Sequence, residues 1–113
     1  MWFKRRPLAL GDFEQLVLLG VLRLGADAYG AALRQEIHTR SGRDISINAV
    51  YTTLERLETK GLVKSWVGEP TAQRGGRRRK CYALRSAGLA SLQQAYRAVT
   101  AMADGFEARL EAK

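Results

Sequence analysis

The sequence of 113 residues contains one cysteine, one histidine and two prolines, and these shortages exclude whole classes of protein. The single cysteine, Cys81, excludes a disulfide framework and any metal cluster built on cysteine. The single histidine, His38, has no partner ligand at metal-binding spacing, so we expect a surface side chain and predict no metal or cofactor. Catalysis needs a positioned acid, base, nucleophile or metal. No such set is recognisable, and an enzyme is not expected.

Long apolar runs are also missing. No stretch of about 18 apolar residues occurs, so the sequence predicts no membrane span. The segment LALGDFEQLVLLGVLRL carries Asp12, Glu14 and Arg23, and it therefore lacks the apolar centre of a secretion signal. The expected compartment is the cytoplasm. The length predicts one domain with at most one additional element.

Positive charge is abundant and unevenly distributed. The formal net charge is +8 and the isoelectric point is about 10.3. The three cations of residues 4–6, and six cations against one acid in residues 62–84, account for the whole excess. Such confinement is typical of a surface that binds a polyanion. The alternative is a generally basic protein without such a partner.

Residues 46–61, SINAVYTTLERLETKG, show the most informative pattern. Apolar side chains recur at helical spacing at Ile47, Val50, Leu54 and Leu57. Ser46 is placed to cap the start of this helix, and Gly61 stands just past its end. The opposite side carries side chains that can enter a major groove and reach base edges. We therefore predict a recognition helix in which bases are read by Asn48, Thr52 and Arg56, with Tyr51 on the flank holding phosphate.

Two further helices are predicted before this one. Residues 12–24 form the first, with Asp12 as N-cap, and it is apolar nearly all round. We expect a helix buried on more than one side, as the central core helix or part of a dimer interface. Residues 29–41 form the second, and the short turn at residues 42–45 predicts a helix-turn-helix. Residues 1–11 form an arm whose cations either contact phosphate or remain solvated.

Two short strands, LVKSW and RKCYAL, are predicted after the recognition helix. We expect one buried face with Tyr82 and Leu84, and Trp66 or Val67 covering the same core. The glycine pair at residues 75–76 marks a tip that can approach a narrow groove. The cations predicted to hold phosphate or enter the minor groove are Lys64, Arg74, Arg77, Arg78, Arg79 and Lys80. A solvated charge run is the alternative, which we disfavour because adjacent cations repel one another without an anion.

Residues 86–113 are predicted as one long helix with Ser86 as N-cap. Apolar side chains recur at alternating spacings of three and four, at Leu89, Leu92, Tyr96, Val99, Ala103, Phe106 and Leu110. A sustained heptad seam needs a partner, most simply the same helix of a second copy. The alternative is packing on its own domain. The predicted fold is mainly α with a small β-hairpin: a winged helix-turn-helix at residues 1–85 and a dimerisation helix at residues 86–113.

With these features in place, the chain resembles the PadR family of bacterial transcriptional regulators in its short, single-domain form. The matching stretches are LGDFEQLVLLGVLRLGADAYG, SINAVYTTLERLETKGLV and GEPTAQRGGRRRKCYALRSAG. The resemblance implies a homodimer that binds an inverted-repeat operator, usually as a repressor. It also implies release of DNA by a small aromatic or drug-like effector near the dimer interface. By position, Tyr51, Lys64 and the arginines around residues 75–76 would contact DNA.

The leading hypothesis is a dimeric, sequence-specific DNA-binding repressor. The alternative from another class is a winged-helix adaptor that dimerises and binds protein without binding DNA. Binding of a protein partner that is insensitive to salt, with no detectable binding of DNA, would favour the adaptor. A separate hypothesis places aromatic side chains around an effector between subunits, and the alternative for each is core packing; the candidates are Trp2, Phe3, Trp66, Tyr96 and Phe106.

Overall fold

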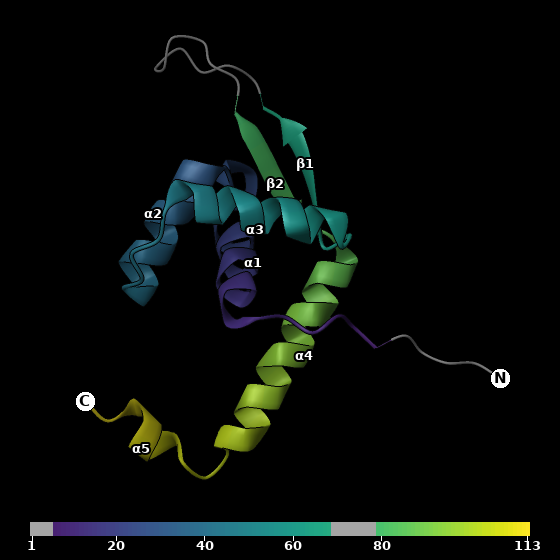
Figure 1. Ribbon diagram of the computed structural model, residues 1–113. Coiled ribbons are helices and arrows are strands. Elements are labelled where there is room, and N and C mark those ends of the chain that lie inside the picture. The colour runs from purple at the N-terminus through teal and green to yellow at the C-terminus, as the bar shows by residue number, and fades with distance from the viewer. Residues whose placement is uncertain (1–5, 69–78) are drawn as a thin grey trace, which may run out of the picture.

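The computed structural model describes residues 6–68 and 79–113. Within these ranges the elements follow in the order α1 (Asp12–Leu24), the 3-10 turn η1 (Gly25–Asp27), α2 (Gly30–Ser41), α3 (Ile47–Thr59), β1 (Val63–Val67), β2 (Lys80–Leu84), α4 (Ser86–Ala103) and α5 (Glu107–Glu111). Figure 1 shows α3 lying across α1, the hairpin rising from one side of the helices, and α4 extending away from them. The fold is mainly helical with one antiparallel hairpin, as predicted.

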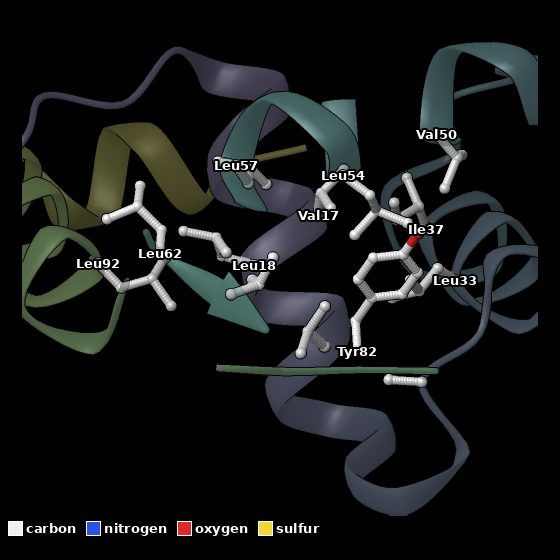
Figure 2. Close-up of a cluster of buried hydrophobic side chains, with 13 residues drawn as sticks. Val17, Leu18, Leu33, Ile37, Val50, Leu54, Leu57, Leu62, Tyr82 and Leu92 are labelled. Atoms are coloured by element: carbon white, nitrogen blue, oxygen red, sulfur yellow. The ribbon is translucent and has the colours of Figure 1, made fainter. Parts of the chain in front are cut away.

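Helix α1 is the central element of the core. It contacts α2, α3, α4 and β2. Its Val17 and Leu18 are fully buried in a cluster to which α2, α3 and the hairpin also contribute. Figure 2 shows Tyr82 of β2 among the aliphatic side chains of this cluster. The prediction of a central core helix is confirmed, although Leu19 and Leu22 leave one stripe of α1 exposed.

The two strands pair in the predicted hairpin, with Val63 opposite Leu84 and Val67 opposite Lys80. The expectation of one buried face on β2 was wrong, because Cys81 and Tyr82 are both buried. The segment before α2 runs along the outer edge of β2, where Tyr82 N–H donates to the Ala28 carbonyl at 2.8 Å. Because this segment covers the outer edge of β2, the side chains of both Cys81 and Tyr82 are buried.

The expectation that Trp66 or Val67 would cover the core was also wrong. Trp66 is 40% exposed and Val67 is 59% exposed. Both residues lie at the end of β1 where the hairpin has risen away from the helices (Figure 1). The core is closed instead by Leu62 and Val63, at the start of the same segment.

Helix starts differ from the predictions at two of three positions. Ser46 caps α3 as predicted, since its hydroxyl accepts a hydrogen bond from Ala49 N–H at 3.0 Å. The N-cap of α1 is Gly11 rather than Asp12, which is the first helical residue. The N-cap of α4 is Arg85 rather than Ser86, and no side chain caps that helix. In both cases the chain enters the helix one residue earlier than the side-chain pattern indicated.

The prediction of one continuous helix over residues 86–113 was wrong. Helix α4 ends at Ala103, and α5 begins at Glu107. Between them Gly105 has φ +90°, a backbone conformation that favours glycine, and its N–H donates to the Glu107 carboxylate at 2.9 Å. The uninterrupted helix is therefore 18 residues, or about 27 Å, in length.

The different roles of the two serines give a matched test. Ser46→Ala should lower the free energy of unfolding by about 1 kcal/mol, because it removes the acceptor for an otherwise unpaired N–H of α3. Ser86→Ala makes the same chemical change at an exposed residue that caps nothing. Urea denaturation of both variants measures the difference. Equal losses would contradict the capping assignment.

Candidate nucleic-acid interface

The outer side of α3 presents the polar side chains that were predicted to read bases. Asn48 and Thr52 are exposed, and they lie on the side of the helix opposite the buried Val50 and Leu54. Helical spacing brings the two polar residues next to each other, because residues four apart share a face. The structure therefore brings these two predicted site residues together on one surface.

Tyr51 lies on one flank of this surface, against the start of α2. A Cβ atom at Gly30 would lie 2.5 Å from the Tyr51 ring and 2.6 Å from its hydroxyl, so only glycine leaves room for the ring there. Tyr51 remains 40% exposed. The packing places a partly exposed phenol beside the first turn of α2, where helix N–H groups favour an anion.

Arg56 lies on the other flank and has a partner within the chain. Its Nε donates to Oε2 of Glu14 at 3.2 Å, and Lys60 Nζ donates to the same oxygen at 2.9 Å. Oε1 of Glu14 accepts from Gly11 N–H at 2.9 Å. Burial raises the pKa of Glu14, but the bonds from Gly11, Lys60 and Arg56 outweigh burial and hold that pKa below its ordinary value of 4.5. The carboxylate is therefore charged at neutral pH.

Sequence reasoning did not identify Glu14 as a site residue. The available signal was an acidic residue on the stripe of α1 that also carries the buried Val17 and Val21. A carboxylate on a buried stripe needs a cation or a hydrogen-bond donor. The sequence could show that need, but it could not show that the partners are Arg56 and Lys60 of a distant helix.

The described part of the hairpin carries three of the predicted cations. Lys64 is exposed on β1, opposite Ala83. The guanidinium of Arg79 lies over the Tyr29 ring at 4.2 Å from its centroid, and Lys80 Nζ lies 5.8 Å from the centroid of Tyr82. Each of these two cations therefore lies near an aromatic ring. The predicted contacts Arg74, Arg77 and Arg78 lie outside the described residues.

Two arginines connect the turn before α3 to the earlier helices. Arg34 Nε donates to the Ile45 carbonyl at 2.7 Å. Arg43 pairs with Asp12 at 3.1 Å and lies over the Phe13 ring. These contacts connect the turn to both earlier helices, and they help to fix the angle at which α3 leaves the turn.

Other kinds of site have little support in the part of the chain that the structure describes. No group of three or more histidine, cysteine, aspartate or glutamate side chains gathers there. No helix among these residues has the length and apolarity to cross a membrane. His38 is exposed, as predicted. Trp66 lies on the hairpin, whereas Tyr96 and Phe106 lie on and just beyond α4, so one copy of the chain does not gather them around a common pocket. Trp2 and Phe3 lie outside the described residues.

These elements define a winged helix-turn-helix: α2 and α3 joined by a short turn, an exposed polar face on α3, and a basic hairpin after it. The transcriptional regulator PadR-like family model matches residues 18–94. The chain therefore belongs to this family, whose members are DNA-binding transcriptional regulators. A search among curated proteins finds no matching sequence.

Solved structures agree with this assignment. A PadR family regulator from Eggerthella lenta is 29% identical, with a TM-score of 0.63 over 88% of this chain and 84% of that chain. A PadR family regulator from Clostridium difficile is 26% identical, with a TM-score of 0.64 over 84% of this chain and 98% of that chain. A PadR-like regulator from Bacillus cereus is 19% identical, with a TM-score of 0.68 over 89% of this chain and 93% of that chain, and it supports the fold alone.

Proposed function

We propose that this regulator is a homodimeric repressor in the cytoplasm that binds an inverted-repeat operator with sequence specificity. The observation that carries the proposal is the outer face of α3, where exposed Asn48 and Thr52 stand beside a basic hairpin. Asn48 can make paired hydrogen bonds to adenine, and Thr52 can contact several bases in the major groove. These two residues are the proposed readers of sequence.

The remaining proposed contacts are sequence-independent. Tyr51, beside the first turn of α2, donates its hydroxyl to a phosphate. On the hairpin, Lys64, Arg79 and Lys80 bind phosphate together with Arg74, Arg77 and Arg78. Each neutralised phosphate contributes roughly 0.9 to the slope of log K against log salt concentration. Affinity is therefore expected to fall steeply as salt is added.

The proposed dimer interface is the seam on α4. On α4, Leu92 is buried and Ala103 is half-buried within the chain, whereas Leu89, Tyr96 and Val99 are exposed. Phe106 and Leu110, which the sequence pattern placed on the same seam, are exposed beyond the break at Gly105 and do not continue the helix. Tyr96 is 72% exposed and Val99 is 61% exposed. A second copy of α4 covers such a stripe at helical spacing. Two recognition helices then enter major grooves about one helical turn apart.

A small aromatic or drug-like effector is the proposed release signal. Tyr96 and Phe106 are both exposed close to the proposed dimer interface, where a planar compound can stack on them. Titration of candidate compounds should lower operator affinity, as measured by fluorescence anisotropy of a labelled operator duplex. An unchanged operator affinity across such compounds would contradict the effector.

The test of the proposed function is fluorescence anisotropy with a duplex from just upstream of the gene and a scrambled duplex, across a salt series. Preference for the upstream duplex by on the order of 10³, with a steep salt slope, supports the repressor. Absence of binding to either duplex at low salt overturns it and favours the adaptor. The exposed Trp66 and Val67 on the hairpin would then be the first candidates for a protein contact.

Two substitutions separate the proposed readers from the phosphate contacts. Asn48→Ala should weaken operator binding by about 1–3 kcal/mol and relax preference at one base pair, because it removes a base contact. Lys64→Ala should weaken binding to operator and scrambled DNA alike and lower the salt slope by about 0.9. Anisotropy on single-base operator variants measures both effects. If the two variants behave alike on every duplex, the assigned roles are wrong.

A further inference from the structure

Glu14 is the most buried carboxylate among the described residues, and it binds two cations of the recognition helix. Its side chain is 8% exposed, whereas the side chains of Arg56 and Lys60 are 48% and 34% exposed. Both cations donate to the same oxygen, Oε2. Glu14 belongs to α1, so this contact joins the central core helix to the helix proposed to enter DNA.

Lys60, the C-cap of α3, lies on a flank of the helix, whereas Arg56, four residues after Thr52, lies between that flank and the outer face. At about 100° per residue, Lys60 lies about 80° around the helix from Thr52 and about 120° from Asn48, on the side that faces Glu14 of α1. Arg56 falls between them, and its Nε is directed to Glu14. A phosphate can recruit these cations only by drawing them away from a carboxylate that they already bind.

Drawing both cations away would leave a buried carboxylate without a compensating positive charge. An unpaired buried carboxylate is strongly unfavourable, so the cations favour Glu14 over an exposed phosphate. Gly11 N–H holds the other carboxylate oxygen and prevents the side chain from following the cations outward. The arrangement therefore lowers the charge that this end of α3 offers to DNA.

We propose that Glu14 is a positioning residue that holds Arg56 and Lys60 against α1 and limits binding to DNA of unrelated sequence. DNA contact by α3 is then made mainly through Asn48, Tyr51 and Thr52. Arg56, which the sequence pattern assigned to base reading, acts in this proposal as a contact between helices. The inference rests on the proposed DNA-binding function and assigns a source for its specificity.

The test compares Glu14→Gln with Glu36→Gln. Glu36 also binds two arginines, Arg23 and Arg40, but neither belongs to α3. The two variants change net charge equally, so a difference between them reports the freed cations of α3. Relative to Glu36→Gln, Glu14→Gln should raise the salt slope on a scrambled duplex by about 1–2 and tighten binding to that duplex by about tenfold. The ratio of operator to scrambled affinity should fall.

Each of two double variants should lose the part of the added salt slope that its missing cation contributes. These variants are Glu14→Gln/Arg56→Gln and Glu14→Gln/Lys60→Gln. A merely structural role for Glu14 would lower the unfolding temperature and leave the salt slope unchanged. Equal slopes for Glu14→Gln and Glu36→Gln would overturn the proposal. So would an added slope that persists undiminished in both double variants.

Single replacements test the same idea in a chain that keeps Glu14. Arg56→Gln and Lys60→Gln should each change the salt slope by much less than 0.9, because neither cation contacts phosphate in the complex. A fall of about 0.9 for either variant would overturn the proposal. If the unaltered chain bound no duplex at low salt, the DNA-binding function would fail together with the inference. Normal binding by the unaltered chain, together with a fall of about 0.9 in the salt slope of either single variant, would reject the inference alone.

Discussion

Val99→Glu should prevent formation of the proposed dimer and lower affinity for the proposed operator by at least about 100-fold. Val99 lies near the middle of the exposed seam of α4 and is 61% exposed in one copy of the chain. A carboxylate there would face its own counterpart across the proposed interface, where desolvation and like charge both oppose association. A monomer binds only one half-site of the operator. It therefore loses the avidity of a dimer that binds both half-sites, which commonly raises apparent affinity by about 10² to 10⁴.

Ala101→Glu is the matched control for this prediction. Ala101 is exposed on the opposite side of α4, so the same charge change should leave the dimer intact. Sedimentation equilibrium measures the mass of each variant, and anisotropy measures its operator affinity. A dimer that survives Val99→Glu would show that the seam is covered in another way. Loss of dimer in both variants would indicate a general effect of charge on α4.

Gly88→Ala should lower the free energy of unfolding by about 3 kcal/mol, at the upper end of the usual range for overpacking. A Cβ atom at this position would lie 2.2 Å from the Leu62 carbonyl oxygen and 2.8 Å from Leu84 Cδ1. The same carbonyl accepts the Arg85 N–H at 2.9 Å, so the backbone there cannot withdraw without losing that bond. Helix α4 would have to shift away from the domain.

Gly20→Ala provides the comparison within another buried helix. Its Cβ atom would lie 2.9 Å from Leu33 Cδ2, the end of a flexible side chain that can rotate. A gain of about 1 kcal/mol in helix propensity offsets part of the repacking. Denaturation should therefore place Gly20→Ala within about 1 kcal/mol of the unaltered chain. A loss of about 1 kcal/mol or less for Gly88→Ala as well would mean that the Leu62 carbonyl does yield, contrary to the packing described above.

Much of the fold followed from short-range pattern. The stripe of Val50, Leu54 and Leu57 predicted α3, and all three side chains are buried. Ser46 predicted its first residue because an N-cap acts within one turn. The hairpin followed from two short apolar runs on either side of a glycine-rich segment. In each case the interactions that determine the element lie within a few residues, so the sequence displays them directly.

Contacts between distant residues were not predictable in the same way. The ion pair of Glu14 with Arg56 joins residues 42 apart, and no local pattern specifies which cation meets the carboxylate. Burial of Cys81 depends on the segment at Ala28, which pairs with the outer edge of β2. The first of these contacts, together with the bond from Lys60, engages two cations near α3. The assignment of individual DNA contacts therefore stays a prediction.

The end of α4 shows a third kind of limit. Phe106 and Leu110 continue the spacing of three and four, so the pattern predicted an unbroken helix. A glycine costs a helix only about 1 kcal/mol relative to alanine. At Gly105 this small preference is reinforced by the bonds from its N–H to the Glu107 carboxylate, and the chain turns. A difference of this size is too small to resolve from periodicity.

The pairing of β2 with Ala28 has a consequence for the order of folding. Helices α1, α2 and α3 are neighbours in sequence and meet through short connections, so they can assemble early and rapidly. Tyr82 fills the centre of the same core but arrives from far along the chain. During synthesis, the three helices therefore expose the apolar surface that Tyr82 covers until β2 has been synthesised. Stability gained at Tyr82 is expected to slow unfolding more than it speeds folding.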